Sequence, residues 1–252
     1  MINDMITAKT LEEIKIMAEG GKILARIMKE LEGIVRPGIA TKDLDKAAEG
    51  LVLASGGKPS FKGYQGYPAC LCASINEEIV HAVPSDMVLK DGDILSLDLG
   101  LIWRGYHTDM AITLPVGKIS HEAKKLLEVT KKALEIGIKE AKISSTFGDI
   151  SFAIQKHVES QGFNVIRELC GHGIGKNLHE DPEILNYGKM GTGTILREGM
   201  VFCLEPMVTA GDWHIKKSKD GFGYQTKDGS LSAHFEHTIA VAPTGCQVLT
   251  DF

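Results

Sequence analysis

Residues 94–113 read ILSLDLGLIWRGYHTDMAIT, an apolar stretch that carries two aspartates. Leucine occupies every second position from 95 to 101, and this period of two predicts a strand whose leucines face a core. Residues typical of strands resume at Tyr106, and the Arg104-Gly105 pair between the two segments predicts a tight turn. The stretch therefore predicts a β-hairpin.

The hairpin would bring the two carboxylates close together. With the turn centred as above, Asp98 faces Ala111 and Asp109 faces Gly100, so the two aspartates are diagonal neighbours on one face. Such neighbours lie roughly 7–8 Å apart, within reach of one cation or of two adjacent cations. The alternative is a solvated face of a two-stranded ribbon, and on this stretch alone solvent exposure is the simpler explanation.

Composition narrows the class of protein. A chain of 252 residues with 43% hydrophobic and 24% charged residues can bury a sizeable core. The net charge of −5, without a cluster of basic residues, gives no reason to expect binding to DNA or to a membrane surface. The start, MINDMITAKTLEEIK, does not resemble a signal peptide, and no apolar run is long enough for a membrane span, so we expect a cytoplasmic protein. The five cysteines lack Cys-x-x-Cys spacing, which predicts reduced thiols.

One order of elements occurs twice along the chain. Thr10 and Glu13 form a capping box at the start of a helix, Thr41 opens a second helix, and strands follow. From Ser120 a capped helix, a second helix that starts near Ser145 and further strands follow in the same order. In both second helices an aspartate precedes a glycine by 13 residues: Asp43 and Gly56, Asp149 and Gly162.

This duplication predicts two pseudo-symmetric halves, about residues 10–115 and 120–245. We expect an α+β fold in which the strands of both halves form one sheet and the helices cover one side of it. No linker or change in composition divides the halves, so a single domain over residues 1–252 is predicted.

The second half contains three more residues that could bind a metal. His172 lies between glycines, Glu205 lies in the apolar run VFCLEPMV, and Glu236 lies in SAHFEHTIAV. A loop histidine and structural salt bridges would explain each residue singly. Few basic residues lie near these three or near Asp98 and Asp109 in sequence, so a metal pair is the simpler explanation for the whole set.

Four carboxylates and one imidazole suit divalent ions such as Mn²⁺, Fe²⁺, Co²⁺ or Zn²⁺ rather than a thiolate cluster. Two such ions about 3.5–4 Å apart would activate a water molecule, which predicts a hydrolase.

Five segments, in this order, closely resemble the type I methionine aminopeptidases: SINEEIVHAVP, LDLGLIWRGYHTDMAIT, CGHGIGKNLHEDPEI, GMVFCLEPMV and SLSAHFEHTIAV. The resemblance covers nearly the whole chain. These enzymes remove the initiator methionine from nascent polypeptides when the second residue is small. The resemblance implies the pita-bread (creatinase/aminopeptidase) fold, a pseudo-two-fold antiparallel sheet backed by helices. It also implies a water or hydroxide bridging two divalent ions, which could be Co, Mn, Fe, Zn or Ni.

Carried over by motif, the metal ligands are Asp98, Asp109, His172, Glu205 and Glu236. The resemblance makes Asp109 and Glu236 the bridging carboxylates and Asp98 a ligand of one ion. It also implies that Glu205 helps to move a proton from the nucleophilic water to the leaving amine.

The resemblance assigns substrate contacts to two histidines that the sequence alone would make ordinary loop residues. His179, in KNLHEDP, would hydrogen-bond the scissile carbonyl oxygen and steady the oxyanion. His81, in EEIVHAVP, would contact the substrate backbone and assist proton transfer.

The loop FKGYQGYPACLC would form the pocket for the methionine side chain. By motif its members are Tyr64, Tyr67 and Cys72. Three positions depart from the bacterial pattern: Phe61 replaces a common cysteine, Leu178 a phenylalanine and Phe222 a tryptophan. These departures leave the chemistry intact but bear on how strictly methionine is selected. Loop packing is the alternative explanation for the two tyrosines.

Three alternatives fit the sequence less well than a methionyl aminopeptidase. X-Pro aminopeptidases and prolidases usually carry a large N-terminal domain, for which this chain is too short. A catalytically silent binding protein would be expected to lose ligands, and type II methionine aminopeptidases have an insertion that the short interval from His172 to Glu205 cannot hold. We therefore expect a monomer that acts on the N-terminal methionine of nascent peptides, with the ribosome near its exit tunnel as a candidate partner.

Overall fold

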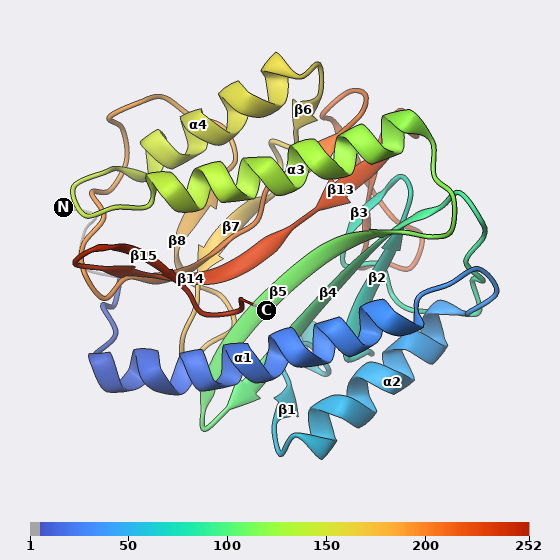
Figure 1. The fold of residues 1–252 in the computed structure, drawn as a ribbon, viewed down its shortest axis with the longest axis horizontal. Coiled ribbons are helices and arrows are strands. Elements are labelled where there is room, and N and C mark those ends of the chain that lie inside the picture. The colour runs from blue at the N-terminus through green and yellow to red at the C-terminus, as the bar shows by residue number, and fades with distance from the viewer. Residues whose placement is uncertain (1–5, 252) are drawn as a thin grey trace.

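The computed structural model describes residues 6–251, in which four α-helices cover one side of a curved antiparallel sheet. Figure 1 shows all four in front of the sheet, with two across the top and two across the bottom. They are α1 (Leu11–Ile34), α2 (Thr41–Ala54), α3 (His121–Glu140) and α4 (Phe147–Ser160). The predicted layering, with helices on one side only, is confirmed. Residues 1–5 lie outside the described residues. They are part of the N-terminal stretch from which we expect no signal peptide.

The main sheet contains strands from both halves of the chain. Its order is β1-β4-β5-β14-β9-β7-β8, with β2 also paired to β4 and β15 to β14. Its strands are β1 (Lys58–Pro59), β2 (Leu71–Ile75), β4 (Ile94–Trp103), β5 (Tyr106–Pro115), β7 (Cys170–Gly173), β8 (Glu180–Leu185), β9 (Val201–Leu204), β14 (Glu236–Ala242) and β15 (Gly245–Val248). The prediction of one shared sheet is therefore confirmed.

The hairpin of β4 and β5 has the predicted register. Asp98 pairs with Ala111 and Asp109 pairs with Gly100. The turn residues Arg104 and Gly105 both have positive φ, 48° and 84°, as expected for a two-residue turn that matches the twist of the strands. The four leucines of β4 are fully buried, so they anchor this strand in the core beneath the helices.

In the main sheet the two halves meet where β5 pairs with β14. Only two residue pairs form this ladder, Ala111 with Glu236 and Met110 with His237. Beyond these pairs a side chain takes the place of the backbone hydrogen bonds. The hydroxyl of Thr238 accepts from the Asp109 N–H and donates to the Asp109 carbonyl, both at 2.8 Å. This junction, which we call the seam, holds an aspartate of the first half against a strand of the second half.

The helices confirm the predicted pseudo-symmetry. Helices α2 and α4 each contain 14 residues. Asp43 and Asp149 occupy the third position of their helices, and Gly56 and Gly162 follow the helix ends with φ of 82° and 85°. A left-handed residue after the last turn favours glycine, which explains why the spacing is the same in both copies.

The helix starts also follow the expected chemistry. Thr10 and Glu13 form the predicted capping box of α1, and Thr146 with Asp149 form the same box at α4, one residue after the predicted start. Helix α2 begins at Thr41 as predicted, but the Thr41 hydroxyl donates to the carbonyl of Ser85 instead of capping the helix.

Two small sheets lie beside the main one. They have the orders β13-β10-β6 and β11-β12-β3. Their strands are β3 (Glu78–Val80), β6 (Asn164–Val165), β10 (Met207–Thr209), β11 (Ile215–Lys217), β12 (Tyr224–Thr226) and β13 (Ser232–His234). Strands β13 and β14 are separated only by Phe235, so one continuous segment of chain serves two sheets.

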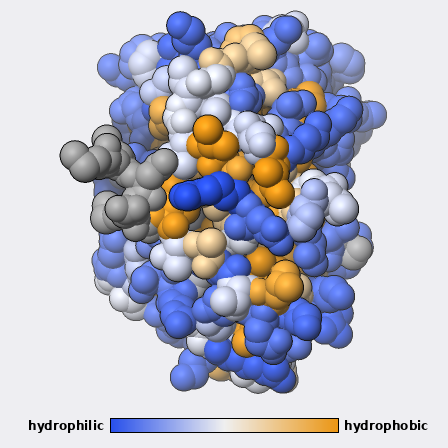
Figure 2. Space-filling view, turned by 90° about the vertical axis from the view of Figure 1, so that its left-hand side faces the viewer, coloured by the Kyte–Doolittle hydropathy of each residue, from blue (hydrophilic) through white to orange (hydrophobic). Residues whose placement is uncertain are grey.

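One face of the molecule is mostly hydrophilic. Figure 2 shows the side that carries the start of α1 and the end of α3, where apolar side chains gather near the middle of a largely hydrophilic face. No helix among residues 6–251 combines the length and the apolar character needed to cross a bilayer.

Candidate metal centre and substrate pocket

All five predicted ligands line one cavity of about 1140 Å³. Asp98 lies on β4, Asp109 on β5 and His172 on β7. Glu205 directly follows β9, and Glu236 is the first residue of β14. The structure thus brings together side chains that are far apart in sequence, from both sides of the seam.

Regular pairing alone aims the two aspartates into this cavity. Because Asp98 and Asp109 are diagonal neighbours in an unbroken register, both side chains leave the same face of the hairpin. The condition set by the predicted hairpin, that both carboxylates lie on one face, is met.

Glu205 is positioned by the end of a strand. Strand β9 stops at Leu204, and Pro206, which has no N–H, cannot continue the ladder as a donor. The carbonyl of Glu205 instead accepts a hydrogen bond of 3.0 Å from the side-chain amide of Asn186. This buried contact fixes the backbone from which the carboxylate extends.

His172 presents a free lone pair to the cavity. Its Nδ1 lies 2.9 Å from the carbonyl oxygen of Gly173, and since a carbonyl only accepts, Nδ1 carries the proton and donates. Burial lowers the pKa of His172 to about 3, so the ring is neutral and Nε2 is unprotonated. Nε2 lies 3.6 Å from Oε1 of Glu205. Two lone pairs face each other there, which is favourable only if a cation or a proton lies between them.

The four acidic residues among the predicted ligands are buried, with exposed fractions of 2–9%. Among residues 6–251, no ion pair joins any of them to lysine or arginine. Burial raises the pKa of Asp109 to about 7. Burial first, and then the negative charges of neighbouring acids, raise the pKa of the other three well above the usual range: Asp98, Glu205 and Glu236.

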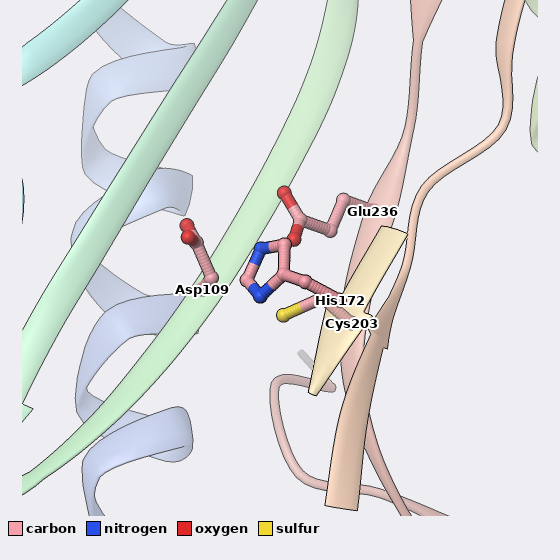
Figure 3. Close-up of side chains that lie close together, drawn as sticks. All are labelled: Asp109, His172, Cys203 and Glu236. Carbon is pink, nitrogen blue, oxygen red and sulfur yellow. The ribbon is translucent and has the colours of Figure 1, made fainter. Parts of the chain in front are cut away.

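These residues fit a divalent metal. Asp98 Oδ1 and Glu236 Oε1 are buried without a hydrogen-bond partner among the described residues. Ligand atoms of Asp109, His172, Cys203 and Glu236 lie within 4.8 Å of one another. Figure 3 shows these four side chains converging on the space between β5 and the strands of the second half. A cation would supply the positive charge that the buried oxygens lack.

Sequence reasoning missed two residues of this centre, Cys203 and His234. Burial raises the pKa of the Cys203 thiol well above its usual range, so the sulfur is a neutral neighbour of the carboxylates. His234 is 1% exposed, and burial lowers its pKa to about 3, which keeps the ring uncharged. The strand period had placed each on the face of a predicted ligand, Cys203 with Glu205 and His234 with Glu236, so the signal was available.

The two predicted substrate histidines also line the cavity. The hydroxyl of Tyr64 lies 2.9 Å from Nδ1 of His179, and the His179 ring packs edge to face against His172 with centroids 4.3 Å apart. His81 has a φ of 60°, a left-handed conformation uncommon outside glycine. A strained backbone at a cavity wall agrees with a functional constraint on His81.

The predicted pocket residues form one apolar cluster beside the carboxylates. Its buried members include Phe61, Tyr67, Cys72 and Leu178, and Tyr64 and Phe222 are among the residues packed against them. The Tyr67 hydroxyl faces away from solvent toward the carbonyls of Leu71 and Ala82, at 3.2 and 3.0 Å. The Phe222 ring packs edge to face on Tyr67 at 5.4 Å. An apolar pocket thus adjoins an acidic centre in the same cavity.

Comparison with known proteins gives a consistent result. Residues 15–243 match the model of metallopeptidase family M24. Methionine aminopeptidase 1 of Bacillus subtilis (strain 168) is 50% identical over 246 residues, which cover 98% of this chain and 99% of the relative. The crystal structure of methionine aminopeptidase from Thermotoga maritima superposes with a TM-score of 0.97 at 44% identity, covering 98% of this chain and all of that one.

A more distant likeness shows the fold alone. Prolidase from Pyrococcus furiosus is 22% identical with a TM-score of 0.79, and the match covers 98% of this chain but 66% of that one. The predicted pita-bread fold is confirmed by these neighbours. The chain belongs to metallopeptidase family M24 and, within that family, to the methionine aminopeptidases.

Proposed function

We propose that this protein hydrolyses the peptide bond after an N-terminal methionine when the second residue is small, with divalent metal held by the five predicted ligands. The observation that carries the proposal is the buried group of four carboxylates and one neutral imidazole beside an apolar pocket. The near-complete coverage of methionine aminopeptidases, against two thirds of a prolidase chain, supports it over the X-Pro reading.

The metal would be held by Asp98, Asp109, His172, Glu205 and Glu236. In the proposal Asp109 and Glu236 would be the carboxylates shared by two ions, and Asp98 would hold one of the ions. When bound, such ions polarise the scissile carbonyl and lower the pKa of a water molecule. The unpartnered oxygens of Asp98 and Glu236 support these assignments, because each is a buried acceptor that needs a positive partner.

Glu205 is the proposed proton carrier. Its burial favours the protonated form, so its carboxylate can accept a proton from the attacking water and later give it to the departing amine. The hydrogen bond from Asn186 holds its backbone still during the transfer.

His179 is the proposed donor to the carbonyl oxygen of the substrate. If the Tyr64 hydroxyl donates to Nδ1, the ring proton lies on Nε2, where it can stabilise the developing oxyanion. His81, on the wall of the same cavity, would hold the substrate backbone.

The apolar cluster would bind the methionine side chain. Tyr64, Tyr67, Phe222 and Phe61 offer aromatic surface to a thioether, and Cys72 and Leu178 complete the walls. The carboxylates would face the free amine of the substrate while the apolar pocket binds the side chain. Together they would select an N-terminal methionine over an internal one.

A peptide set tests the proposal. Apo protein reconstituted with Mn²⁺, Fe²⁺ or Co²⁺ is assayed on Met-Gly-, Met-Ala-, Leu-Gly- and Ala-Pro-x peptides. We expect cleavage of the two methionine peptides at least about tenfold faster than that of Leu-Gly-, since one apolar side chain is exchanged for another. A preference for Ala-Pro-x would support the X-Pro reading, and no turnover with any metal would support a binding protein.

The finer parts of the proposal need their own measurements. Two ions per chain, drawn from Co, Mn, Fe, Zn or Ni, are checked by metal analysis after purification. Action as a monomer and as one catalytic domain over residues 1–252 is checked by light scattering and limited proteolysis. The protein is also proposed to act in the cytoplasm on nascent peptides near the ribosomal exit tunnel. Cosedimentation with ribosomes checks this.

A further inference from the structure

His234 is a third imidazole beside the proposed ligands, and neither of its ring nitrogens has a hydrogen-bond partner among the described residues. Its Nε2 lies 3.5 Å from Oε2 of Glu205 and 4.0 Å from Oε2 of Glu236. A histidine that is 1% exposed and points at two carboxylates without other partners requires an explanation.

The backbone of His234 is held firmly. The hydroxyl of Thr113 accepts from the His234 N–H and lies 2.8 Å from the His234 carbonyl, to which it can donate. Thr113 is in turn 2.8 Å from the hydroxyl of Ser96 on the neighbouring strand of the hairpin. The ring therefore extends from a segment fixed to β5, at the end of β13 and two residues before β14 begins.

The two oxygens of Glu205 face two different imidazoles. Oε1 faces Nε2 of His172 at 3.6 Å, and Oε2 faces Nε2 of His234 at 3.5 Å. His172 has its proton on Nδ1, bound to the Gly173 carbonyl, so it cannot donate to Glu205. It can share a cation with Oε1, since two ligand atoms each about 2.0–2.2 Å from one ion can lie this far apart.

His234 differs because no backbone carbonyl fixes its proton. An ionised carboxylate only accepts hydrogen bonds, so the contact with Oε2 is favourable when the single proton of the neutral ring lies on Nε2. Carboxylates that bind metals are commonly held by a hydrogen bond to an outer partner of this kind.

We propose that His234 is a positioning residue: when metal is bound, its Nε2 donates to Oε2 of Glu205, which would leave Oε1 to hold the metal. This hydrogen bond would fix the plane of the carboxylate that moves the proton. This inference rests on the proposed function, and it adds a residue that the metal ligands alone do not include.

The test uses full-length His234→Leu and His234→Gln, with His157→Leu as the matched control. His157, on α4, also has a buried ring nitrogen without a partner among the described residues, but among those residues only His234 of the two lies within 4.0 Å of proposed ligands. Glutamine keeps an N–H donor of similar reach, and leucine keeps the bulk without a donor.

Three measurements are made on each variant: Mn²⁺ affinity of the apo protein by calorimetry, the melting temperature of the apo protein, and kcat and KM on a Met-Ala- peptide. We expect His234→Leu to lose about 10–100-fold in Mn²⁺ affinity, with kcat falling more than KM rises. His234→Gln should restore affinity to within about threefold of wild type, as expected when one donor replaces another. The melting temperature of apo His234→Leu should not fall, because without metal neither ring nitrogen has a hydrogen-bond partner among the described residues. His157→Leu should match wild type in affinity.

Equal Mn²⁺ affinity for wild type and His234→Leu would overturn the inference, as would a glutamine variant as weak as the leucine one. Pulsed EPR of the Mn²⁺-loaded proteins gives a separate check. A nitrogen coupling that disappears in His234→Leu would make His234 a direct ligand instead. If wild type itself neither binds Mn²⁺ nor cleaves Met-Ala-, the proposed function fails first, so the two failures are distinguishable.

Discussion

The two halves of the molecule deliver their carboxylates to the cavity in different ways. Asp98 and Asp109 stand on a hairpin whose ten residue pairs run without a break. In the second half His172 lies at a register shift, Glu205 follows the end of β9, and Glu236 begins β14. In a regular strand the register alone fixes the direction of a side chain. In an interrupted strand a side chain can point in a direction that regular pairing does not allow. A continuous hairpin thus provides a fixed wall, and broken strands close the site around it.

The largest expected effect separates the two aspartates of the hairpin. Loss of an outer hydrogen-bond partner of a metal ligand can weaken metal binding by about 100-fold. Asp109→Asn should weaken Mn²⁺ binding by more than this, because both ions would lose a ligand. Asp98→Asn should weaken one ion and leave the other within about tenfold of wild type. Calorimetric titration with Mn²⁺ measures both.

Glu236→Gln, on the other side of the seam, is the control for the bridging role and should resemble Asp109→Asn. If Asp98→Asn proved the more damaging change, the proposed division between bridging and single-ion ligands would be wrong.

The next effect concerns the connection between β7 and β8. His179→Ala should lower kcat by about 10²–10³-fold, the usual cost of losing one donor to an oxyanion, while metal content stays unchanged. Steady-state kinetics and metal analysis of the same sample provide the measurement.

Tyr64→Phe sharpens this result, because it keeps His179 but removes the hydroxyl bound to Nδ1. A loss of about 1 kcal/mol, roughly fivefold in kcat, is expected. An unchanged kcat in His179→Ala with metal fully bound would rule out the oxyanion role.

A third prediction concerns pH. The pKa of Asp109, raised to about 7 by burial, means that the apo protein holds a proton there below neutrality, and a cation must displace it. Mn²⁺ affinity should therefore rise as pH increases from 5.5 to 7.5, by about tenfold per pH unit for each proton released. His172, with a pKa of about 3, is already neutral and should not contribute.

Calorimetry in two buffers of different ionisation enthalpy counts the released protons directly. A flat affinity over this range would mean that Asp109 is ionised in the apo protein.

The smallest expected effect tests the seam. Thr238→Val removes the hydroxyl that bonds both backbone groups of Asp109 and should lower the free energy of unfolding by about 1–3 kcal/mol, because two buried backbone groups lose their partner. Urea denaturation of the apo protein measures this difference.

Thr130→Val on α3 is the matched control. Thr130 is equally buried, but its hydroxyl bonds one carbonyl that is already within a helix, so a smaller loss is expected. Equal losses in both variants would show that the seam hydroxyl has no special importance.

The difference between the halves also explains what could be predicted from the sequence. The alternation of leucines and the Arg104-Gly105 turn determine the hairpin register locally, so the Asp98–Asp109 geometry followed from short-range rules. The equal spacing from aspartate to glycine likewise indicated the two corresponding helices, α2 and α4, because helix caps are local features.

The second half is less readable because its ligands depend on where strands stop. The position of Glu205 depends on Pro206 and on a hydrogen bond from Asn186, which is 19 residues away in sequence. Cys203 and His234 lay on the correct faces, but nothing local indicated that β9 and β13 would converge on the hairpin. For His172, Glu205 and Glu236, resemblance to a family supplied the ligand roles. The structure then supplied the neighbours Cys203 and His234.

The seam has a consequence for assembly. Strands β5 and β14 share only two residue pairs, so the seam itself has few backbone bonds, and the proposed ligands lie on both sides of it. Strands β3 and β12 also pair across the two halves. Ions bound there would act as a crosslink between the halves and stabilise the closed junction in proportion to their free concentration. Metal supply would then govern how often the seam opens, and exchange of the Asp109 amide, which donates to Thr238 across the seam, would report the metal status of the protein without any substrate.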